Sequence, residues 1–315
     1  MTTPGLRDII SSVATATHSP LLGGVELGGT KCVCLLGTGP DDIRIQSSVP
    51  TGDDPAVTLD RIERILRDAV ATHGPIHALG VASFGPVDLT RGSPTYGFIT
   101  TTPKPGWRNV RVADRLAEAM RVPVAFDTDV NGAALAEGRW GAARNLDDFA
   151  YVTVGTGVGV GLVAGGHLVH GFAHPELGHI RIARKSGDSW RGVCAFHGDC
   201  VEGLASGEAI AARAGMPADQ VPADHPAWEL AAHALSQLLH TLVVATSPRR
   251  ILVGGGVAEG HPALLWHLRR ELLSSLNGYL DLQALAGPID RYVVAPGLGR
   301  LAGPLGAIAL AAAAA

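Results

Sequence analysis

The segment Gly24-Val-Glu-Leu-Gly-Gly-Thr-Lys31 joins two short apolar runs, Leu21 to Leu27 and Cys32 to Leu36. Two such runs around a glycine turn predict a β-hairpin whose turn is exposed. About 130 residues later the pattern returns, with a mostly apolar run at 148–154, the turn Gly155-Thr156-Gly157 and a second apolar run at 158–163. A repeated opening of this kind predicts that the chain consists of two similar halves.

Helical and extended patterns alternate along the rest of the chain. Asp53-Asp54-Pro55 opens an amphipathic helix that ends at Gly74-Pro75. The other predicted elements are strands at 78–82, 122–126, 251–253 and 292–294, helices at 110–120, 132–139 and 228–246, and an alanine-rich terminal helix. This alternation predicts α/β layers. The expected parts are an N-terminal extension at 1–20, an α/β lobe at 21–126, a larger α/β lobe at 127–300, and a C-terminal helix at 301–315 that packs back on the first lobe.

Composition excludes several classes of protein. The chain has 315 residues, 46% of them hydrophobic, and a dispersed net charge of −4, so it has no basic stripe for a nucleic-acid backbone. No run of apolar residues is long enough to span a membrane, and Met1 to Pro20 lacks the pattern of a secretory signal. Four cysteines are too few for a disulfide scaffold of this size, and Cys32 and Cys34 are interpreted as small core residues. We therefore expect a cytoplasmic protein that binds neither nucleic acid nor membrane.

Three glycine clusters follow apolar strands. Glycine lets backbone N–H groups turn toward an anion, so each cluster is a candidate phosphate site, while a plain hairpin turn explains any one of them equally well. A P-loop is not supported, because Gly29-Thr30-Lys31 lies between strands and lacks the required order of residues. The candidate phosphate-binding and nucleotide-binding residues are Gly28, Gly29, Thr30, Lys31, Gly155, Thr156, Gly157, Gly254, Gly255 and Gly256.

Three segments together resemble the ROK (repressor, open reading frame, kinase) family of sugar kinases. They are Gly24 to Lys31, Val154 to Gly159, and Leu252 to Gly256, which are similar to the two phosphate segments and the adenosine segment of that family. The resemblance covers residues 21 to 311. It implies the two-lobed, actin-like and hexokinase-like ATPase fold (ribonuclease H-like) with a central ligand cleft, Mg²⁺ with ATP, a hexose and a homodimer. Glu26 stands where many members have Asp, which implies an indirect contact with magnesium.

The segment Phe126-Asp-Thr-Asp-Val-Asn131 follows a predicted strand and leads into a helix. Local physics favours a helix cap, since Asp and Thr are preferred at that position. The resemblance instead implies that Asp129 is the catalytic base and also contacts the sugar. Glucokinase-like members usually carry Asn just before this Asp. Thr128 occupies that sugar-binding position here, which points to a fructokinase-like branch.

Histidines and cysteines gather in the second half of the chain. His179, Cys194, His197 and Cys200 suit tetrahedral Zn²⁺, and a closed set of four protein ligands indicates a structural site. Two buried thiols with unrelated surface histidines are the alternative. The resemblance implies that His179 is the first zinc ligand and that a His-containing knuckle is typical of fructokinases. It also places Gly85, Glu176, His179 and Glu202 on the sugar side.

Some residues near these motifs carry less information. The role of His174 stays open, with solvent exposure as one interpretation, and His170 is expected to have no role. Trp107 is as well explained by stacking on a ligand as by anchoring a loop.

These observations predict ATP-dependent phosphorylation of a hexose, with D-fructose converted to fructose 6-phosphate. The alternatives are a kinase for glucose, mannose or N-acetylmannosamine, and a non-catalytic sugar-sensing regulator of the same family. Regulators of that kind carry an N-terminal helix-turn-helix module, and barely twenty residues precede the first predicted strand.

Overall fold

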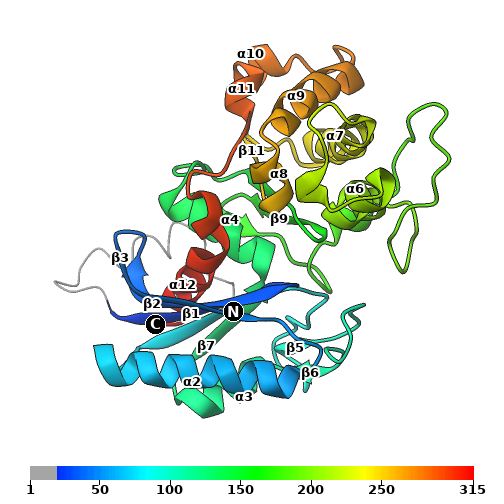
Figure 1. Cartoon of the computed structure of the whole chain (residues 1–315). Coiled ribbons are helices and arrows are strands. Elements are labelled where there is room, and N and C mark those ends of the chain that lie inside the picture. Colours follow the sequence, from blue (N-terminus) through cyan, green and yellow to red (C-terminus); the bar gives the residue numbers. More distant parts are fainter. Residues whose placement is uncertain (1–19) are drawn as a thin grey trace. The chain divides into compact units, whose positions relative to one another are not determined.

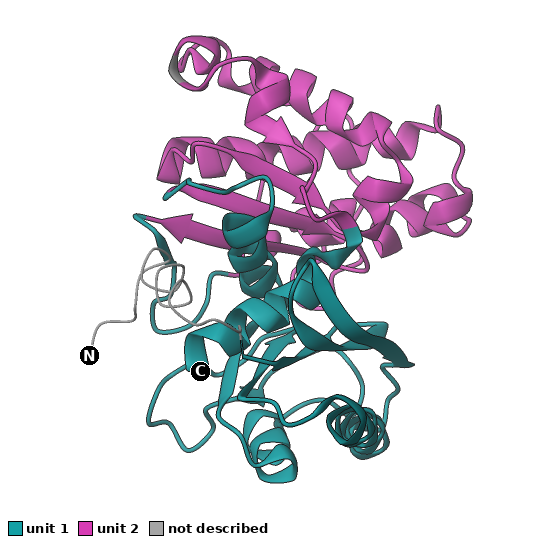
Figure 2. Ribbon diagram, turned by 90° about the vertical axis from the view of Figure 1, so that its left-hand side faces the viewer, with its two compact units in different colours: residues 1–147, 165–175, 300–315 teal, residues 148–164, 176–299 magenta. Residues whose placement is uncertain are grey.

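A computed structural model describes residues 20–315, apart from the side chain of Leu285, so the predicted extension at 1–20 lies outside the described residues except for Pro20. The chain forms two compact units (Figure 2). Unit 1 contains the described residues up to Asp147, together with Gly165–Pro175 and Arg300–Ala315. Unit 2 contains Asp148–Ala164 and Glu176–Gly299.

Unit 1 is built on a five-stranded sheet in the order β3-β2-β1-β4-β7. The strands are β1 (Leu22–Leu27), β2 (Lys31–Gly39), β3 (Asp42–Pro50), β4 (Ala78–Ser83) and β7 (Val124–Thr128). The strands β1, β2 and β3 pair antiparallel, whereas β4 and β7 run parallel to β1. A separate two-stranded sheet joins β5 (Phe98–Ile99) to β6 (Val110–Arg111).

Four helices accompany the unit 1 sheets: α2 (Pro55–His73), α3 (Ala113–Met120), α4 (Asp129–Trp140) and α12 (Ala302–Ala314), the last preceded by η3 (Gly299–Leu301). Figure 1 shows α2 and α3 on one face of the large sheet and α12 on the other. The carboxylate of Asp54 caps α2 by accepting hydrogen bonds from the backbone nitrogens of Ala56 (2.9 Å) and Val57 (3.3 Å). Helix α2 buries Leu59, Ile62 and Leu66, and each such side chain contributes about 1.5–3 kcal/mol by leaving water.

Helix α4 belongs to unit 1 because it packs against α12. A Cβ atom added at Gly306 would overlap the backbone of Gly132 and lie 2.7 Å from the nitrogen of Ala133, so only glycine permits this approach. The predicted boundary between residues 126 and 127 therefore falls inside unit 1, and the described division comes after Asp147.

Unit 2 is built on the strands β9-β8-β11-β12, in that order, of a second sheet. Its strands are β8 (Phe149–Val154), β9 (Val158–Ala164), β11 (Ile251–Gly254) and β12 (Val293–Val294), paired at one edge with β10 (His167–Leu168). Its helices are η1 (Leu177–His179), α5 (Val201–Ala205), α6 (Gly207–Ala214), η2 (Ala218–Gln220), α7 (Pro226–Thr246), α8 (Gly256–Gly260), α9 (Ala263–Leu276), α10 (Leu282–Ala286) and α11 (Ile289–Tyr292). The long helices α7 and α9 pack on each other through buried leucines.

Both predicted hairpins are present, as β1–β2 and as β8–β9. The segment expected to be helical from residue 110 is helical only from Ala113, because Val110 and Arg111 pair with β5 instead. Cys32 and Cys34 are buried and unpaired, as expected of core residues. Within residues 20–315 no helix combines the length and the apolar character that a membrane span requires.

Candidate functional site

The junction of β7 and α4 carries the residue expected to be the base. Thr128 caps α4, since its Oγ1 accepts a hydrogen bond from the backbone nitrogen of Asn131 at 3.2 Å. Asp129 opens the helix, and its Oδ1 accepts a hydrogen bond from the backbone nitrogen of Val130 at 2.9 Å. Burial raises the pKa of Asp129 to about 6. The prediction that a residue of this segment caps the helix is therefore confirmed, and the capping residue is Thr128.

Glu26, on β1, lies within the electrostatic influence of Asp129. Burial, reinforced by the negative charge of Asp129 and opposed by Lys31, raises the pKa of Glu26 to about 7. A Cβ atom at Gly303 of α12 would overlap the Glu26 carboxylate, so the glycine makes room for it. The pKa of Glu26 therefore responds to one further carboxylate, on α4, and to one ammonium group, on β2.

The first glycine turn connects β1 to β2. The nitrogen of Gly28 donates to the carbonyl oxygen of Lys31 at 3.1 Å, which closes the turn. Thr51 braces it: its hydroxyl donates to the Gly28 oxygen at 2.8 Å, and its nitrogen donates to the Thr30 oxygen at 2.9 Å. Gly29, Thr30 and Lys31 are exposed, and no atom lies within 4 Å of the Cβ position at Gly29. The hydrogen bonds from Thr51 fix the backbone of the turn, while the residues of the turn remain exposed to solvent. An anion site requires both.

The other two glycine clusters belong to unit 2. The nitrogen of Gly155 donates to Gly157 across the second turn at 2.9 Å, and its oxygen accepts from the nitrogen of Gly207 at 2.7 Å. In the third cluster, β11 ends at Gly254 and α8 begins at Gly256. Gly255 between them has a φ of 91°, which L residues rarely adopt, and a side chain there would meet the backbone of Val154. The third cluster therefore packs tightly on β8 beside the second.

His179, Cys194, His197 and Cys200 form the one group of possible metal ligands found among the described residues. The His179 Nδ1 atom lies 3.6 Å from the Cys194 sulfur, 3.5 Å from the Cys200 sulfur and 3.3 Å from Nδ1 of His197. The Cys194 sulfur lies 3.7 Å from the same His197 atom. A zinc tetrahedron with Zn–S of about 2.3 Å and Zn–N of about 2.0–2.1 Å has edges of roughly 3.3–3.8 Å. The donor atoms and their spacing therefore fit such a metal.

Glu202, from α5, lies beside both this cluster and the second turn. Its Oε2 accepts a hydrogen bond from the nitrogen of Val158 at 3.1 Å, and its Oε1 lies 3.8 Å from Nε2 of His179. Glu176 is exposed and precedes η1. In unit 1, half-buried Gly85 precedes the cis-linked Pro86.

Two histidines, His170 and His174, make contacts that the sequence did not predict. His170, for which the sequence indicated no role, contacts the buried Asp127, with its Nε2 3.0 Å from Oδ2 of that residue. His174 is only 7% exposed, which excludes the solvent-exposed interpretation. The sequence held no signal for either, because their partners are far away in the chain.

Trp107 is a buried anchor whose indole nitrogen donates to the oxygen of Gly52 at 2.7 Å.

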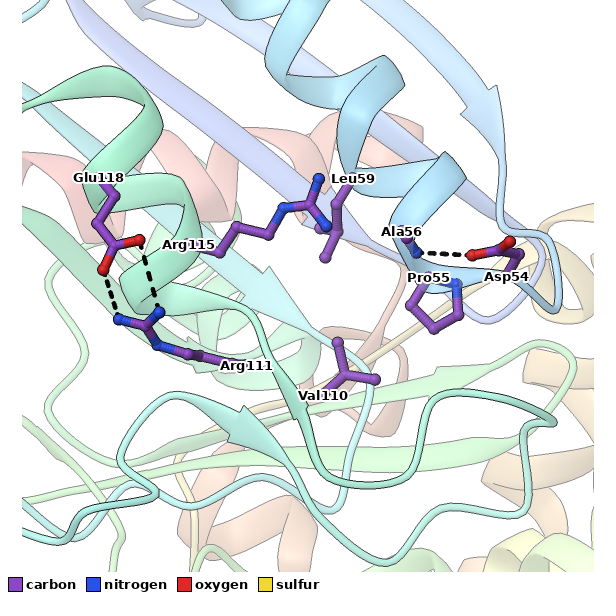
Figure 3. A pocket seen from close by; sticks show the side chains of 8 residues that line it. All are labelled: Asp54, Pro55, Ala56, Leu59, Val110, Arg111, Arg115 and Glu118. Carbon is purple, nitrogen blue, oxygen red and sulfur yellow. Dashed lines mark hydrogen bonds and ion pairs between the residues drawn. The ribbon is translucent and has the colours of Figure 1, made fainter.

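A surface pocket of about 590 Å³ lies away from these residues, between the start of α2 and the segment from β6 to α3 (Figure 3). Two arginines line it. Arg111 is paired with Asp114 and Glu118, and Arg115 with Asp60 and Glu63. Because these charges are neutralised, the pocket is a poor anion site and is not part of the candidate active site.

Comparison with known proteins now places the chain. Fructokinase from Zymomonas mobilis is 41% identical over 298 residues, which is 93% of this chain and 97% of that protein. Fructokinase from Pediococcus pentosaceus is 38% identical over 294 residues, covering 93% of this chain and 98% of that protein. The solved structure of a ROK family glucokinase from Streptomyces griseus, in complex with glucose and AMPPNP, is 26% identical with a TM-score of 0.71, and the match covers 92% of this chain and 99% of that one.

The structural match confirms the expected actin-like, hexokinase-like fold class. The model of the ROK family matches residues 22–314, almost the whole described chain. The chain therefore belongs to the ROK family.

Proposed function

We propose that this chain is an ATP-dependent fructokinase, which transfers the γ-phosphoryl group of ATP to O6 of D-fructose and yields fructose 6-phosphate and ADP. Asp129 is the observation that carries the proposal: it is a half-buried carboxylate with a raised pKa, at the carboxyl end of β7 and the start of α4. Ligands in α/β proteins bind at such strand ends. Fructose as the substrate is supported by the two fructokinases that match 93% of the chain.

In the proposed reaction Asp129 accepts the proton of the O6 hydroxyl while O6 forms its bond to the γ-phosphorus. The bond from that phosphorus to the β,γ-bridging oxygen breaks, and its electron pair leaves with ADP. A pKa of about 6 suits this task, because the carboxylate is ionised at neutral pH and is a stronger base than an ordinary aspartate. The remaining rate enhancement comes from positioning and charge stabilisation.

The glycine turns supply the phosphate contacts in this proposal. The braced turn from Gly28 to Lys31, with Thr30, offers exposed amides, a hydroxyl and an ammonium group, and Gly155, Thr156 and Gly157 offer a second set. Gly254, Gly255 and Gly256 border the adenosine. Mg²⁺ bound with ATP would offset the charge of the phosphates, and Glu26 would hold it through water.

The proposed sugar-binding residues are Gly85, Thr128, Asp129, Glu176, His179 and Glu202. Carboxylates accept hydrogen bonds from sugar hydroxyls, and the second nitrogen of His179 is available because Nδ1 faces the metal ligands. Thr128 lacks the amide that an asparagine would present at this position. Fructose is favoured over glucose for this reason and because His197 is part of the metal cluster.

We assign Zn²⁺ to the four-ligand cluster, with a structural role. All four positions are protein ligands, so no open position remains for a reacting water. Bound zinc would fix the segment from His179 to Cys200 and thereby Glu202, two residues further on. The proposal also includes a cytoplasmic homodimer that does not bind nucleic acid.

The test is a coupled ADP-release assay with MgATP and each of fructose, glucose, mannose and N-acetylmannosamine. Turnover with fructose at the highest kcat/KM supports the proposal, and NMR of the product distinguishes phosphorylation at O6 from other positions. A higher kcat/KM with one of the other sugars would replace fructose by that sugar. No ADP release with any of them would overturn the kinase assignment and leave the sugar-sensing regulator.

A further inference from the structure

Two histidines fasten the segment Gly165–Pro175 within unit 1. Nε2 of His170 lies 3.0 Å from Oδ2 of Asp127. Nε2 of His174 accepts a hydrogen bond from the backbone nitrogen of Val87 at 3.0 Å, two residues after Gly85. The segment is therefore attached at one end to the β7–α4 junction and at the other to the loop after β4.

Asp127 is the centre of this arrangement. Its side chain is 9% exposed, and its Oδ1 accepts hydrogen bonds from the nitrogen of Thr128 and from Nδ2 of Asn131, both at 2.7 Å. The Asn131 amide and the His170 ring lie 3.2 Å apart, side by side on the same carboxylate. Both oxygens of Asp127 are thus in use, and a buried carboxylate needs such partners to offset its loss of hydration.

The network surrounds Asp129 on both sides in sequence. Thr128 precedes the base and is joined to Asn131 through the helix cap, while Asn131 follows it by two residues and is joined to Asp127. Asp129 therefore starts a helical turn that is bonded to Asp127 on both sides, through the backbone nitrogen of Thr128 and the side-chain amide of Asn131. His170 is the member of this network that comes from a distant part of the chain.

The surroundings of His170 favour the cationic form of its ring as a partner for the Asp127 carboxylate. Its hydrogen bond to Asp127, aided by one to the carbonyl of Leu168, raises the pKa of the imidazole above its usual value. Nε2 of the ring lies 3.0 Å from the Asp127 carboxylate, and a protonated ring can donate a hydrogen bond there. A charge-assisted pair holds geometry better than a neutral hydrogen bond.

We propose that His170 is a positioning residue for phosphoryl transfer, which fixes the carboxylate of Asp129 through Asp127 and Asn131. The inference rests on the proposed function, since it assumes that Asp129 is the base. A displacement of about 1 Å at a reacting group can cost about 10²-fold in rate. His170 touches neither phosphate turn, so its contribution belongs to kcat and not to the binding of ATP.

The test compares His170→Ala with the matched control His167→Ala, which lies in the same segment with an exposed side chain. We expect kcat with fructose to fall about 10- to 100-fold in His170→Ala while KM for ATP stays within about twofold. Added imidazole is expected to restore at least about a third of the lost kcat, because the His170 side chain is 32% exposed and the space it leaves is open to solvent. His167→Ala is expected to match the wild type, with and without imidazole.

A second variant separates positioning from folding. His170→Gln keeps a donor for Asp127 without the charge, and we expect its kcat to lie between those of His170→Ala and the wild type at an unchanged melting temperature. In a double-mutant cycle, Asp127→Asn and His170→Ala should lower kcat by less than the product of their separate effects. An additive result, a wild-type kcat in His170→Ala, or a loss that imidazole does not restore would each overturn the inference. Failure of the wild type to release ADP with any sugar would overturn the proposed function instead.

Discussion

Oε2 of Glu202 lies 3.1 Å from the backbone nitrogen of Val158, which donates a hydrogen bond to it. The same carboxylate has its other oxygen 3.8 Å from Nε2 of His179. One side chain therefore connects the strand after the second glycine turn to His179 of the cysteine and histidine cluster, and both contacts lie within unit 2.

This connection predicts different effects for two substitutions at Glu202. In Glu202→Gln the amide oxygen can still accept from Val158, so we expect KM for ATP within about threefold of the wild type and KM for fructose raised about tenfold or more, as for the loss of a charged acceptor. In Glu202→Ala the Val158 amide loses its partner, and KM for ATP should rise as well. Initial-rate kinetics with each substrate varied in turn give both constants. Identical behaviour of the two variants would refute the connection.

The proposed base predicts a large loss of turnover with little loss of binding. Asp129→Asn should lower kcat by about 10²- to 10⁴-fold, the usual contribution of a general base. Calorimetric titration should give ATP and fructose affinities close to those of the wild type. The wild-type kcat/KM for fructose should fall about tenfold per pH unit below pH 6, because protonated Asp129 cannot accept the O6 proton. A flat profile between pH 5 and pH 7 would contradict the assignment.

As the pH rises through the pKa of Asp129, the stability of the protein is expected to fall while its activity rises. The pKa of Asp129 is about 6 in the folded protein and near 3.8 when unfolded, so the folded state binds more protons between these values and loses stability as pH rises through that window. Asparagine has no charge to desolvate. Asp129→Asn should therefore unfold at a higher temperature than the wild type at pH 8, and the difference should vanish below about pH 4. Thermal unfolding at a series of pH values checks this, with Asp219→Asn as a surface control.

Removal of the metal is expected to destabilise the fold and weaken fructose binding, because the metal holds residues in place and does not take part in the reaction. Burial raises the pKa of the Cys200 thiol to about 12, so a metal that binds there must displace its proton. We expect one zinc per chain by atomic absorption, and a chelator should lower the melting temperature and raise KM for fructose. His197→Cys should retain the metal, since thiolate is also a zinc ligand, whereas His197→Ala should lose it. Full stability and activity in verified metal-free protein would rule out a structural metal.

The contact between α4 and α12 predicts a steric effect at a distance from the ligands. Gly306→Ala would place a methyl group against the backbone of Gly132, and overpacking of this kind typically costs about 1–3 kcal/mol. Because α4 begins with Asp129, kcat should fall together with stability. Gly260→Ala, at an exposed position of helix α8 with nothing within 4 Å and no positive φ, is the control for the loss of a helical glycine. An unchanged unfolding temperature in Gly306→Ala would show that the helices can separate without cost.

The local features of the fold were predictable because the sequence carries them over short distances. The runs on either side of Gly28 and Gly155 predicted both hairpins, and Asp54-Pro55 predicted the start of α2. Strand β3 was missed because it is a half-exposed edge strand with no continuous apolar run. The inclusion of α4 in unit 1 had no local signal, because it depends on α12, a contact across more than half of the chain.

The candidate site also has one part that the sequence predicted and another part that it did not. The ligand set that includes Cys194, His197 and Cys200 was visible in its spacing, and His179 completes it in the structure. The partnership of Asp127 with His170 was not visible, since 43 residues separate them and a single histidine has no pattern. Physical reasoning from the sequence also could not decide which residue caps α4, as Asp and Thr are both good caps.

The return of residues 300–315 to unit 1 sets the order in which the protein can be completed during synthesis. Strands β1 and β4 are made early, yet the helix that covers them, α12, is made only after all the residues of unit 2. At about 5–20 residues per second, the stretch from 148 to 299 takes roughly 8–30 s to translate. Throughout that interval the helix α4, which begins with Asp129, lacks its contact with α12, so nascent chains should become competent for catalysis only after α12 has been made.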